Sequence, residues 1–257
     1  MKQVPNQNEY FESIHQARKQ VLEALRHVRF TKLDPLLTHE QVLPFASYAP
    51  WRDDSRFLET FDQAKSHSHV DIYRCFELWS LVLQTKELEG DVLEVGVWKG
   101  GTAAILGRAM QTMNDSSRLW LADTFKGVVK VGLHDTLYEG GEHSDTSATL
   151  VENFLRSAGL SNFNLLQGVF PEETGEKVSK RKIKLCHVDV DSHDSARDVV
   201  GWVWPRLVVG GAVVFDDYGF WGCEGVTNAV NRLRAKGRLV IHNLNGHAIL
   251  IKTREVE

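Results

Sequence analysis

The pattern of apolar residues changes near residue 91 of the chain. Beyond that point, short apolar runs alternate with stretches in which apolar residues recur at helical spacing. Strands that alternate with helices are typical of a parallel sheet covered on both faces. We therefore predict strands at residues 92–95, 119–122, 164–167, 183–190 and 212–215, and helices at residues 102–113, 146–158, 172–178, 192–204 and 226–235.

The last part of the chain departs from this alternation. Residues 238–242 and 247–252 are predicted strands, and the turn Asn243-Leu244-Asn245-Gly246 between them favours a hairpin. Such a hairpin adds one antiparallel strand to an otherwise parallel sheet. The expected fold class is α/β, a Rossmann-like doubly wound sheet that is mostly parallel.

The first part of the chain predicts helices and irregular backbone. Residues 9–30 and 70–86 each show an amphipathic helical pattern, and prolines break residues 33–56. We expect a helical extension over residues 1–69 and a main domain over residues 70–257. The first helix either packs on the main domain or forms a lid or a subunit contact. A subunit contact would make the protein a homo-oligomer.

Composition narrows the choice of partners and compartment. The formal net charge of −4 argues against a nucleic acid as the main partner. Cys75, Cys186 and Cys223 are far apart and odd in number, which favours a reducing compartment. No apolar run reaches the length of a bilayer, and the N-terminus lacks an apolar signal core. We expect a soluble, cytoplasmic protein with no membrane partner.

The stretch from Glu94 to Thr102 is the first candidate binding site. It joins the first predicted strand to a helix through the sequence E-V-G-V-W-K-G-G-T. Gly96 permits a sharp turn, and the free N–H groups of the following helix attract an anionic group. Glu94 could accept a hydrogen bond from an ammonium group. The amino-acid end of S-adenosylmethionine suits this site, whereas the alternative is that the glycines serve helix packing alone.

Acidic residues follow the predicted strands at the edge where open α/β sheets bind ligands. Asp123 ends the second strand, where it either holds ribose hydroxyls or caps the next turn. Asp189 and Asp191 are two residues apart, so we expect them on one face of the fourth strand. Asp216 and Asp217 end the fifth strand, which we expect to lie beside the fourth.

This gathering of carboxylates needs an offsetting charge. Two carboxylates about 5 Å apart repel by roughly 3 kcal/mol at an effective dielectric near 20. A proton, a basic partner or a divalent cation would offset the repulsion, and oxygen ligands favour Mg²⁺, Ca²⁺ or Mn²⁺. Capping of the following helices is the alternative. A histidine near a bound hydroxyl could act as a base, and the candidates are His134, His143, His187 and His193.

Four motifs in this order resemble the macrocin O-methyltransferase family. They are the stretch from Glu94 to Thr102, D-T-F-K-G at 123–127, D-V-D-S-H-D-S at 189–195, and G-G-A-V-V-F-D-D-Y-G at 210–219. The resemblance spans roughly residues 91–234 and implies a class I methyltransferase fold, S-adenosylmethionine and Mg²⁺. It also implies methyl transfer to a hydroxyl of a sugar or another natural product, so a glycosylated natural product is the expected partner.

The resemblance implies roles for particular residues. Asp189, Asp216 and Asp217 would bind the metal, and Asp191 would be the general base, with His143 from the long loop as the reserve candidate. Cofactor contacts would come from Glu94, Gly96, Val97, Trp98, Gly101, Thr102, Asp123, Thr124, Phe125, Gly168, Val169 and Phe170.

Some positions depart from the family pattern, and these leave the acceptor open. His193 stands where the family has an aromatic residue, and Val169 stands where it has tryptophan. The loop after Gly127 is short and lacks the usual proline.

Two other functions are compatible with parts of the sequence. The glycine turn and Asp123 also fit a nicotinamide-dependent oxidoreductase, although Trp98 disrupts the G-x-G start. A non-enzymatic interaction module is the other alternative, but it would have no use for four mutually repelling carboxylates.

Overall fold

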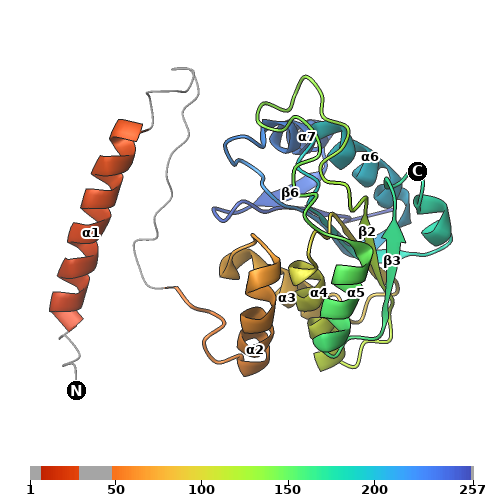
Figure 1. Ribbon diagram of the computed structural model, residues 1–257, viewed down its shortest axis with the longest axis horizontal. Coiled ribbons are helices and arrows are strands. Elements are labelled where there is room, and N and C mark those ends of the chain that lie inside the picture. The colour runs from red at the N-terminus through yellow and green to blue at the C-terminus, as the bar shows by residue number, and fades with distance from the viewer. Residues whose placement is uncertain (1–6, 29–47, 256–257) are drawn as a thin grey trace. The chain divides into compact units, whose positions relative to one another are not determined.

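In the computed structural model, residues 7–28 and 48–255 are described, and the chain divides into two compact units after Ala49. The first unit contains α1 (Gln7–Val28), which confirms the predicted N-terminal helix, although residues 29 and 30 of the prediction lie outside the described residues. The second unit, Pro50–Glu257, carries the sheet (Figure 1). Among the described residues, no helix is both long enough and apolar enough to cross a membrane.

The sheet of the second unit has seven strands in the order β3-β2-β1-β4-β5-β7-β6. All pairs are parallel except β5 with β7 and β6 with β7, so the predicted C-terminal hairpin is confirmed. The strands are β1 (Asp91–Val95), β2 (Leu119–Asp123), β3 (Phe163–Gln167), β4 (Ile183–Val188), β5 (Leu207–Phe215), β6 (Leu239–His242) and β7 (Ala248–Ile251).

Helices cover both faces of the sheet. Alternate residues of the central strands enter opposite cores: Val92 packs with the helices of one face and Leu93 with those of the other. The first face carries α2 (Ser55–Ala64), α3 (Ile72–Gln84), α4 (Gly101–Thr112) and α5 (Ala148–Ser157), and the second carries α6 (His193–Val203) and α7 (Glu224–Ala235). Short 3₁₀ turns are η1 (Lys65–His67), η2 (Gly175–Val178) and η3 (Trp204–Arg206).

The helix α2 was not predicted, because prolines mark the preceding stretch as irregular. Asp54 caps it by accepting a hydrogen bond from the backbone N–H of Phe57 at 3.0 Å. Phe57 and Ala64 are buried against the main core. The structure therefore places the boundary between the units after Ala49, and α2, which the sequence assigned to the extension of residues 1–69, belongs to the second unit.

Two strand predictions need correction. The strand predicted at residues 183–190 ends at Val188, so Asp189 and Asp191 lie beyond it, and the alternation argument for their common face does not apply. The strand predicted at residues 212–215 begins earlier, at Leu207, and it continues through Gly210, whose φ is +84°. The helix predicted at residues 172–178 is reduced to the 3₁₀ turn η2.

The register of the sheet brings three strand ends to one level. Val95 of β1 pairs with Val188 of β4, and Val188 pairs with Phe215 of β5. The residues that follow each strand therefore emerge side by side at the carboxyl edge. The chain changes direction across the sheet between β1 and β4, which is where ligands bind in open α/β sheets.

Candidate active site

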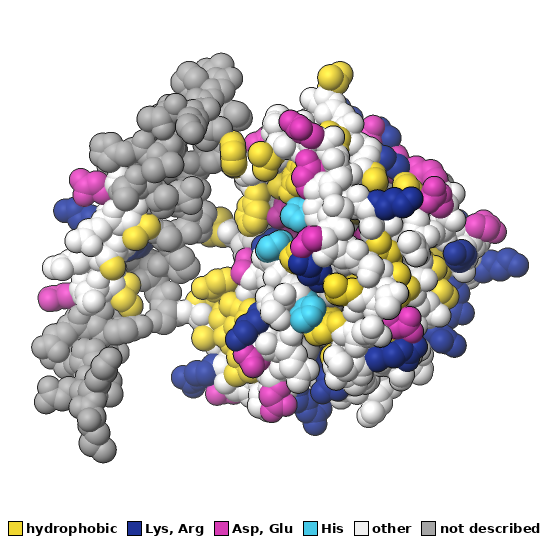
Figure 2. All heavy atoms as spheres, in the orientation of Figure 1, with side chains coloured by type: hydrophobic (Ala, Val, Ile, Leu, Met, Phe, Trp, Pro, Cys, Tyr) yellow, Lys and Arg dark blue, Asp and Glu magenta, His cyan; other side chains and the backbone are white. Residues whose placement is uncertain are grey.

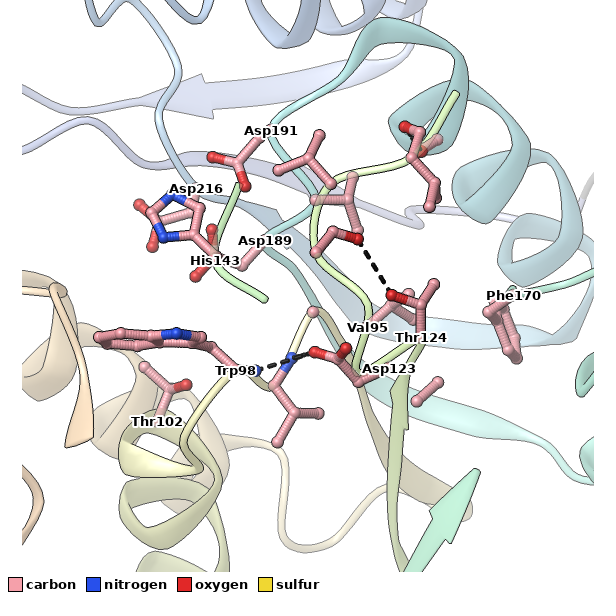
Figure 3. Close-up of a pocket in the computed structure, with 18 of the residues that line it drawn as sticks. Val95, Trp98, Thr102, Asp123, Thr124, His143, Phe170, Asp189, Asp191 and Asp216 are labelled. Carbon is pink, nitrogen blue, oxygen red and sulfur yellow. Dashed lines mark hydrogen bonds between the residues drawn. The ribbon is translucent and has the colours of Figure 1, made fainter. Parts of the chain in front are cut away.

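A pocket opens at the carboxyl edge of β1, β2 and β4, with a volume of about 310 Å³. Figure 3 shows Asp189, Asp191, Asp216 and His143 on one side of it, and Asp123, Thr124 and Phe170 on the other. Of the predicted site residues, the pocket lining includes Gly96, Val97, Trp98, Thr102, Asp123, Thr124, His143, Gly168, Val169, Phe170, Asp189, Asp191, Asp216 and Asp217.

The glycine-rich turn is held in place by Asp123. One carboxylate oxygen, Oδ2, accepts hydrogen bonds from the backbone N–H groups of Val97 and Trp98 at 2.7 and 2.8 Å. The other oxygen accepts from the N–H of Phe125 at 2.6 Å. Asp123 thus acts as the cap that the sequence offered as one alternative, and it remains on the pocket wall, where its ribose role stays a prediction.

Gly96 is required by the close approach of two strands. It has a φ of +91°, and a Cβ at this position would lie 1.6 Å from the backbone oxygen of Asp189. The N–H of Asp189 also donates to the carbonyl of Val95 at 2.9 Å. The turn after β1 and the start of the loop after β4 are therefore in direct backbone contact.

The structure places three predicted cofactor residues outside the pocket lining. Glu94 is fully buried, and its Oε1 lies 2.9 Å from Nδ1 of His187, so its carboxylate is engaged below the pocket floor. Gly101 allows α4 to approach the Ala64–Ser68 segment, because a Cβ there would lie 2.6 Å from Ser68. The ring of Phe125 enters the hydrophobic core.

Three acidic side chains of the pocket have raised pKa values. Burial and the charges of Asp216 and Asp217 raise the pKa of Asp189 well above its ordinary value. Burial and the charges of Asp216 and Asp191 raise the pKa of Asp217 to about 7. Burial also raises the pKa of Asp191. Burial is the largest cause of each shift, and the mutual repulsion of the carboxylates, which the sequence predicted, adds to it.

Arg74 of α3 lines the pocket, and the sequence analysis did not single it out. Its side chain is 8% exposed, its Nη1 contacts Asp216, and the same atom donates to Oδ1 of Asp217 at 3.3 Å. Its Nε donates to Oδ2 of Asp71, the residue that caps α3, at 3.0 Å. A basic partner therefore offsets part of the repulsion. No sequence signal joins Arg74 to residues more than a hundred positions away.

Tyr138 is the second residue that was missed. It lies in the long loop after β2 and lines the pocket, as Asp191 does. Burial and the charge of Asp191 raise the pKa of the Tyr138 hydroxyl. The hydroxyl therefore stays protonated near the predicted general base.

The histidines separate into different roles. His143 lines the pocket and lies edge-on to Trp98, with ring centroids 5.9 Å apart. His187, one of the candidate bases, is fully buried and does not line the pocket. The rings of His193 and His134 lie near each other, with centroids 4.4 Å apart, outside the lining. Figure 2 shows histidine, acidic and hydrophobic side chains gathered around a hollow on the second unit.

Strained backbone is concentrated around this pocket. Four lining residues other than glycine have a positive φ, namely Trp98 (46°), His143 (61°), Asp191 (60°) and Asp217 (60°). Each costs of order 1–3 kcal/mol and persists only where its surroundings impose it. Such strain is typical of functional sites, and it supports the assignment of this edge as the active site.

The strand order, the antiparallel β7 and the pocket at the β1 and β4 ends define a class I methyltransferase fold. Solved structures agree. The O-methyltransferase NovP superposes with a TM-score of 0.64 at 24% identity, covering 73% of this chain and 83% of that one. An O-methyltransferase from Bacillus cereus in complex with SAH gives a TM-score of 0.53 at 14% identity, covering 78% and 92%.

The sequence comparisons are more specific. The family described as Macrocin-O-methyltransferase (TylF) matches residues 72–245, more than half of the chain. A tetracenomycin-type rhamnosyl 4'-O-methyltransferase from Streptomyces olivaceus is 31% identical over 183 residues, covering 66% of this chain and 70% of the relative. The mycinamicin III 3''-O-methyltransferase of Micromonospora griseorubida is 33% identical over 148 residues, covering 52% and 58%.

The chain belongs to the macrocin O-methyltransferase family, and it is an S-adenosylmethionine-dependent O-methyltransferase. This confirms the resemblance stated from the motifs. It also decides against the two alternatives, a nicotinamide-dependent oxidoreductase and a non-enzymatic interaction module.

Proposed function

We propose that this enzyme methylates a hydroxyl group of a glycosylated natural product, with a divalent cation held by Asp189, Asp216 and Asp217. The relatives named above act on sugar hydroxyls of antibiotics, which supports this acceptor class. The observation that carries the proposal is that Asp189, Asp191, Asp216 and Asp217 line one pocket together with the Gly96–Trp98 turn.

The residues around the cluster fit a cation that prefers oxygen ligands. Asp216 is 2% exposed, and its Oδ2 has no hydrogen-bond partner. Arg74 offsets the charges of these carboxylates only in part, and the pKa values of Asp189 and Asp217 remain raised. When bound, such a cation would lower the pKa of an acceptor hydroxyl as a Lewis acid.

The remaining steps belong to this chain's own groups. The turn at Gly96–Trp98 and the wall at Asp123 hold the amino-acid and ribose parts of the cofactor. Asp191 accepts the proton of the acceptor hydroxyl. His143, on the same side of the pocket, is the reserve base (Figure 3). Alignment of the oxygen with the methyl group supplies much of the remaining catalysis.

A panel of glycosylated and phenolic acceptors tests the proposal, with product mass as the readout. We expect a gain of one methyl group on a sugar hydroxyl in the presence of Mg²⁺. EDTA should abolish turnover and Mg²⁺ should restore it, whereas S-adenosylhomocysteine should still raise the melting temperature in EDTA. Full turnover in EDTA would exclude the metal part of the proposal and leave the methyltransferase assignment intact.

We also propose that the first unit mediates self-association. The helix α1 has 22 residues and is longer than a short linker needs to be. It lies in a unit separate from the catalytic domain. Its apolar residues recur at helical spacing, and such a stripe is stable when it is buried against another surface.

A further inference from the structure

A second cluster of potential metal ligands lies beneath the active-site pocket, on three different strands or turns. It consists of His187 on β4, Asp216 after β5 and His247 before β7, and the nearest ligand atoms of the three all lie within 4.8 Å of one another. His187 and His247 have no solvent exposure, and Asp216 is 2% exposed. Neither histidine lines the pocket, whereas Asp216 does.

The atoms that face the centre of this cluster lack hydrogen-bond partners. Nε2 of His187, Nε2 of His247 and Oδ2 of Asp216 are all buried and unpartnered. Nε2 of His187 is 3.7 Å from Oδ2 of Asp216, and Nε2 of His247 is 3.7 Å from Oδ1. Both distances are beyond hydrogen-bonding range. Leaving one buried polar atom unpaired costs about 1–3 kcal/mol, so three together imply a missing partner.

The outer contacts of the two histidines fix their chemistry. Nδ1 of His187 lies 2.9 Å from Glu94, and Nδ1 of His247 lies 2.5 Å from Glu77. An ionised carboxylate only accepts hydrogen bonds, so each Nδ1 carries the proton. In the neutral imidazole, the lone pair is then on Nε2 and points to the cluster centre. A carboxylate behind each histidine is the usual support of a metal-binding imidazole.

The spacing also suits a shared ion. Two ligand atoms bound at about 2.0–2.1 Å to a tetrahedral ion are roughly 3.4 Å apart, close to the 3.7 Å between Nε2 of His187 and Oδ2 of Asp216. Three carboxylates, from Glu77, Glu94 and Asp216, surround the two imidazoles, and a divalent ion would offset their charge. Arg74 contacts the Oδ1 side of Asp216, and Oδ2 is left for the cluster.

We propose that His187, His247 and Asp216 bind a structural divalent transition-metal ion, of which Zn²⁺ fits the donors best. Two imidazoles and one carboxylate prefer such an ion to Mg²⁺. The ion joins β4, the end of β5 and the C-terminal hairpin, and through Glu77 it also fixes α3. It holds Asp216 at the floor of the pocket. Asp216 is also a ligand of the oxygen-only cation of the proposed function, so its carboxylate would be shared by the two ions.

The alternative to a metal ion is that both imidazoles are protonated. Burial opposes a charged imidazole, but Asp216 and Glu94 raise the pKa of His187 to about 10 when no metal is present. Protonated histidines would offset the same carboxylates without a metal. A direct measurement of metal ligation therefore separates the two occupants.

The wild-type protein gives the first test. After exhaustive dialysis against a weak chelator, we expect about one equivalent of added Zn²⁺ to stay bound in the presence of excess Mg²⁺. X-ray absorption at the zinc edge should show two imidazole ligands at about 2.0 Å. A protein that retains no Zn²⁺, or one whose zinc has only oxygen neighbours or a sulfur neighbour, would overturn the proposal.

Variants give the second test. Glu77→Gln keeps the shape of the residue behind His247 and should weaken Zn²⁺ binding by roughly 10–100-fold. His247→Asn should weaken it further, whereas the matched control His242→Asn, at an exposed position on β6, should not change it. Equal Zn²⁺ affinity in Glu77→Gln, His247→Asn and the control would refute the site. These readouts do not use turnover, so they are independent of the proposed function.

Discussion

Replacement of Gly96 by alanine tests the backbone contact on which the pocket depends. Gly96 has a φ of +91°, and a Cβ there would lie 1.6 Å from the oxygen and 2.6 Å from the carbon of the Asp189 carbonyl. Both atoms belong to backbone, so no side-chain rotation can relieve the overlap. The ends of β1 and β4 must move apart.

The expected magnitude has two parts. A non-glycine residue in the left-handed region costs roughly 1–2 kcal/mol. Forcing extra volume into a packed interior costs about 1–3 kcal/mol more. Gly96→Ala should therefore lower the free energy of unfolding by roughly 2–5 kcal/mol. Because the displaced carbonyl belongs to Asp189, cofactor binding should weaken too, by about tenfold for each 1.4 kcal/mol of distortion that binding must reverse.

Gly141 provides a matched control. Its φ of +92° is nearly the same, but no atom lies within 4 Å of the position that its Cβ would take. Gly141→Ala should therefore show the conformational cost alone, about 1–2 kcal/mol. Urea denaturation of both variants, with calorimetry of S-adenosylhomocysteine binding, separates the two parts. Equal losses of stability in the two variants would refute the contact between Gly96 and Asp189.

Four further results are expected. Asp191→Asn should reduce kcat by roughly 10²–10⁴-fold and leave S-adenosylhomocysteine affinity unchanged. The exposed control Asp53→Asn should have normal kcat. Near-normal turnover of Asp191→Asn would show that another group is the base. Tyr138→Phe removes a hydroxyl that lowers the pKa of Asp191, so the acid limb of the kcat profile should shift to higher pH. An unshifted limb would contradict this interaction. Without divalent cations, the free energy of unfolding should fall as pH rises from about 4 to about 7. Over this range Asp217 keeps a proton in the folded protein, where its pKa is about 7, but loses it in the unfolded chain. Denaturation curves of Asp217→Asn should show a weaker dependence of stability on pH. Deletion of residues 1–30 should lower the particle mass in light scattering, and a full-length protein that is monomeric at high concentration would exclude self-association through this segment.

The order of elements and the edge that binds ligands could be predicted from the sequence. Apolar periodicity reports which faces of a segment are buried, and this local property was enough to place all seven strands and the final hairpin, although it missed α2 and set the bounds of β4 and β5 wrongly. The carboxyl ends of parallel strands share one edge of a sheet. For that reason, the positions of the acids directly after the strands were sufficient to predict that they gather at one site. Most of the glycine-turn and loop residues predicted to contact the cofactor do line the pocket.

The partners of these acids were decided only by the tertiary structure. The contact between Arg74 and Asp216 joins residues 142 positions apart, and it depends on where α3 packs against the sheet. Glu94 has the same strand-end position as the other acids, yet its side chain meets His187 on the neighbouring strand and is buried. His187 and His247 come together because the C-terminal hairpin returns antiparallel to β5. Local periodicity carries no information on such contacts, since strand order, register and loop conformation determine which side chains meet across the sheet.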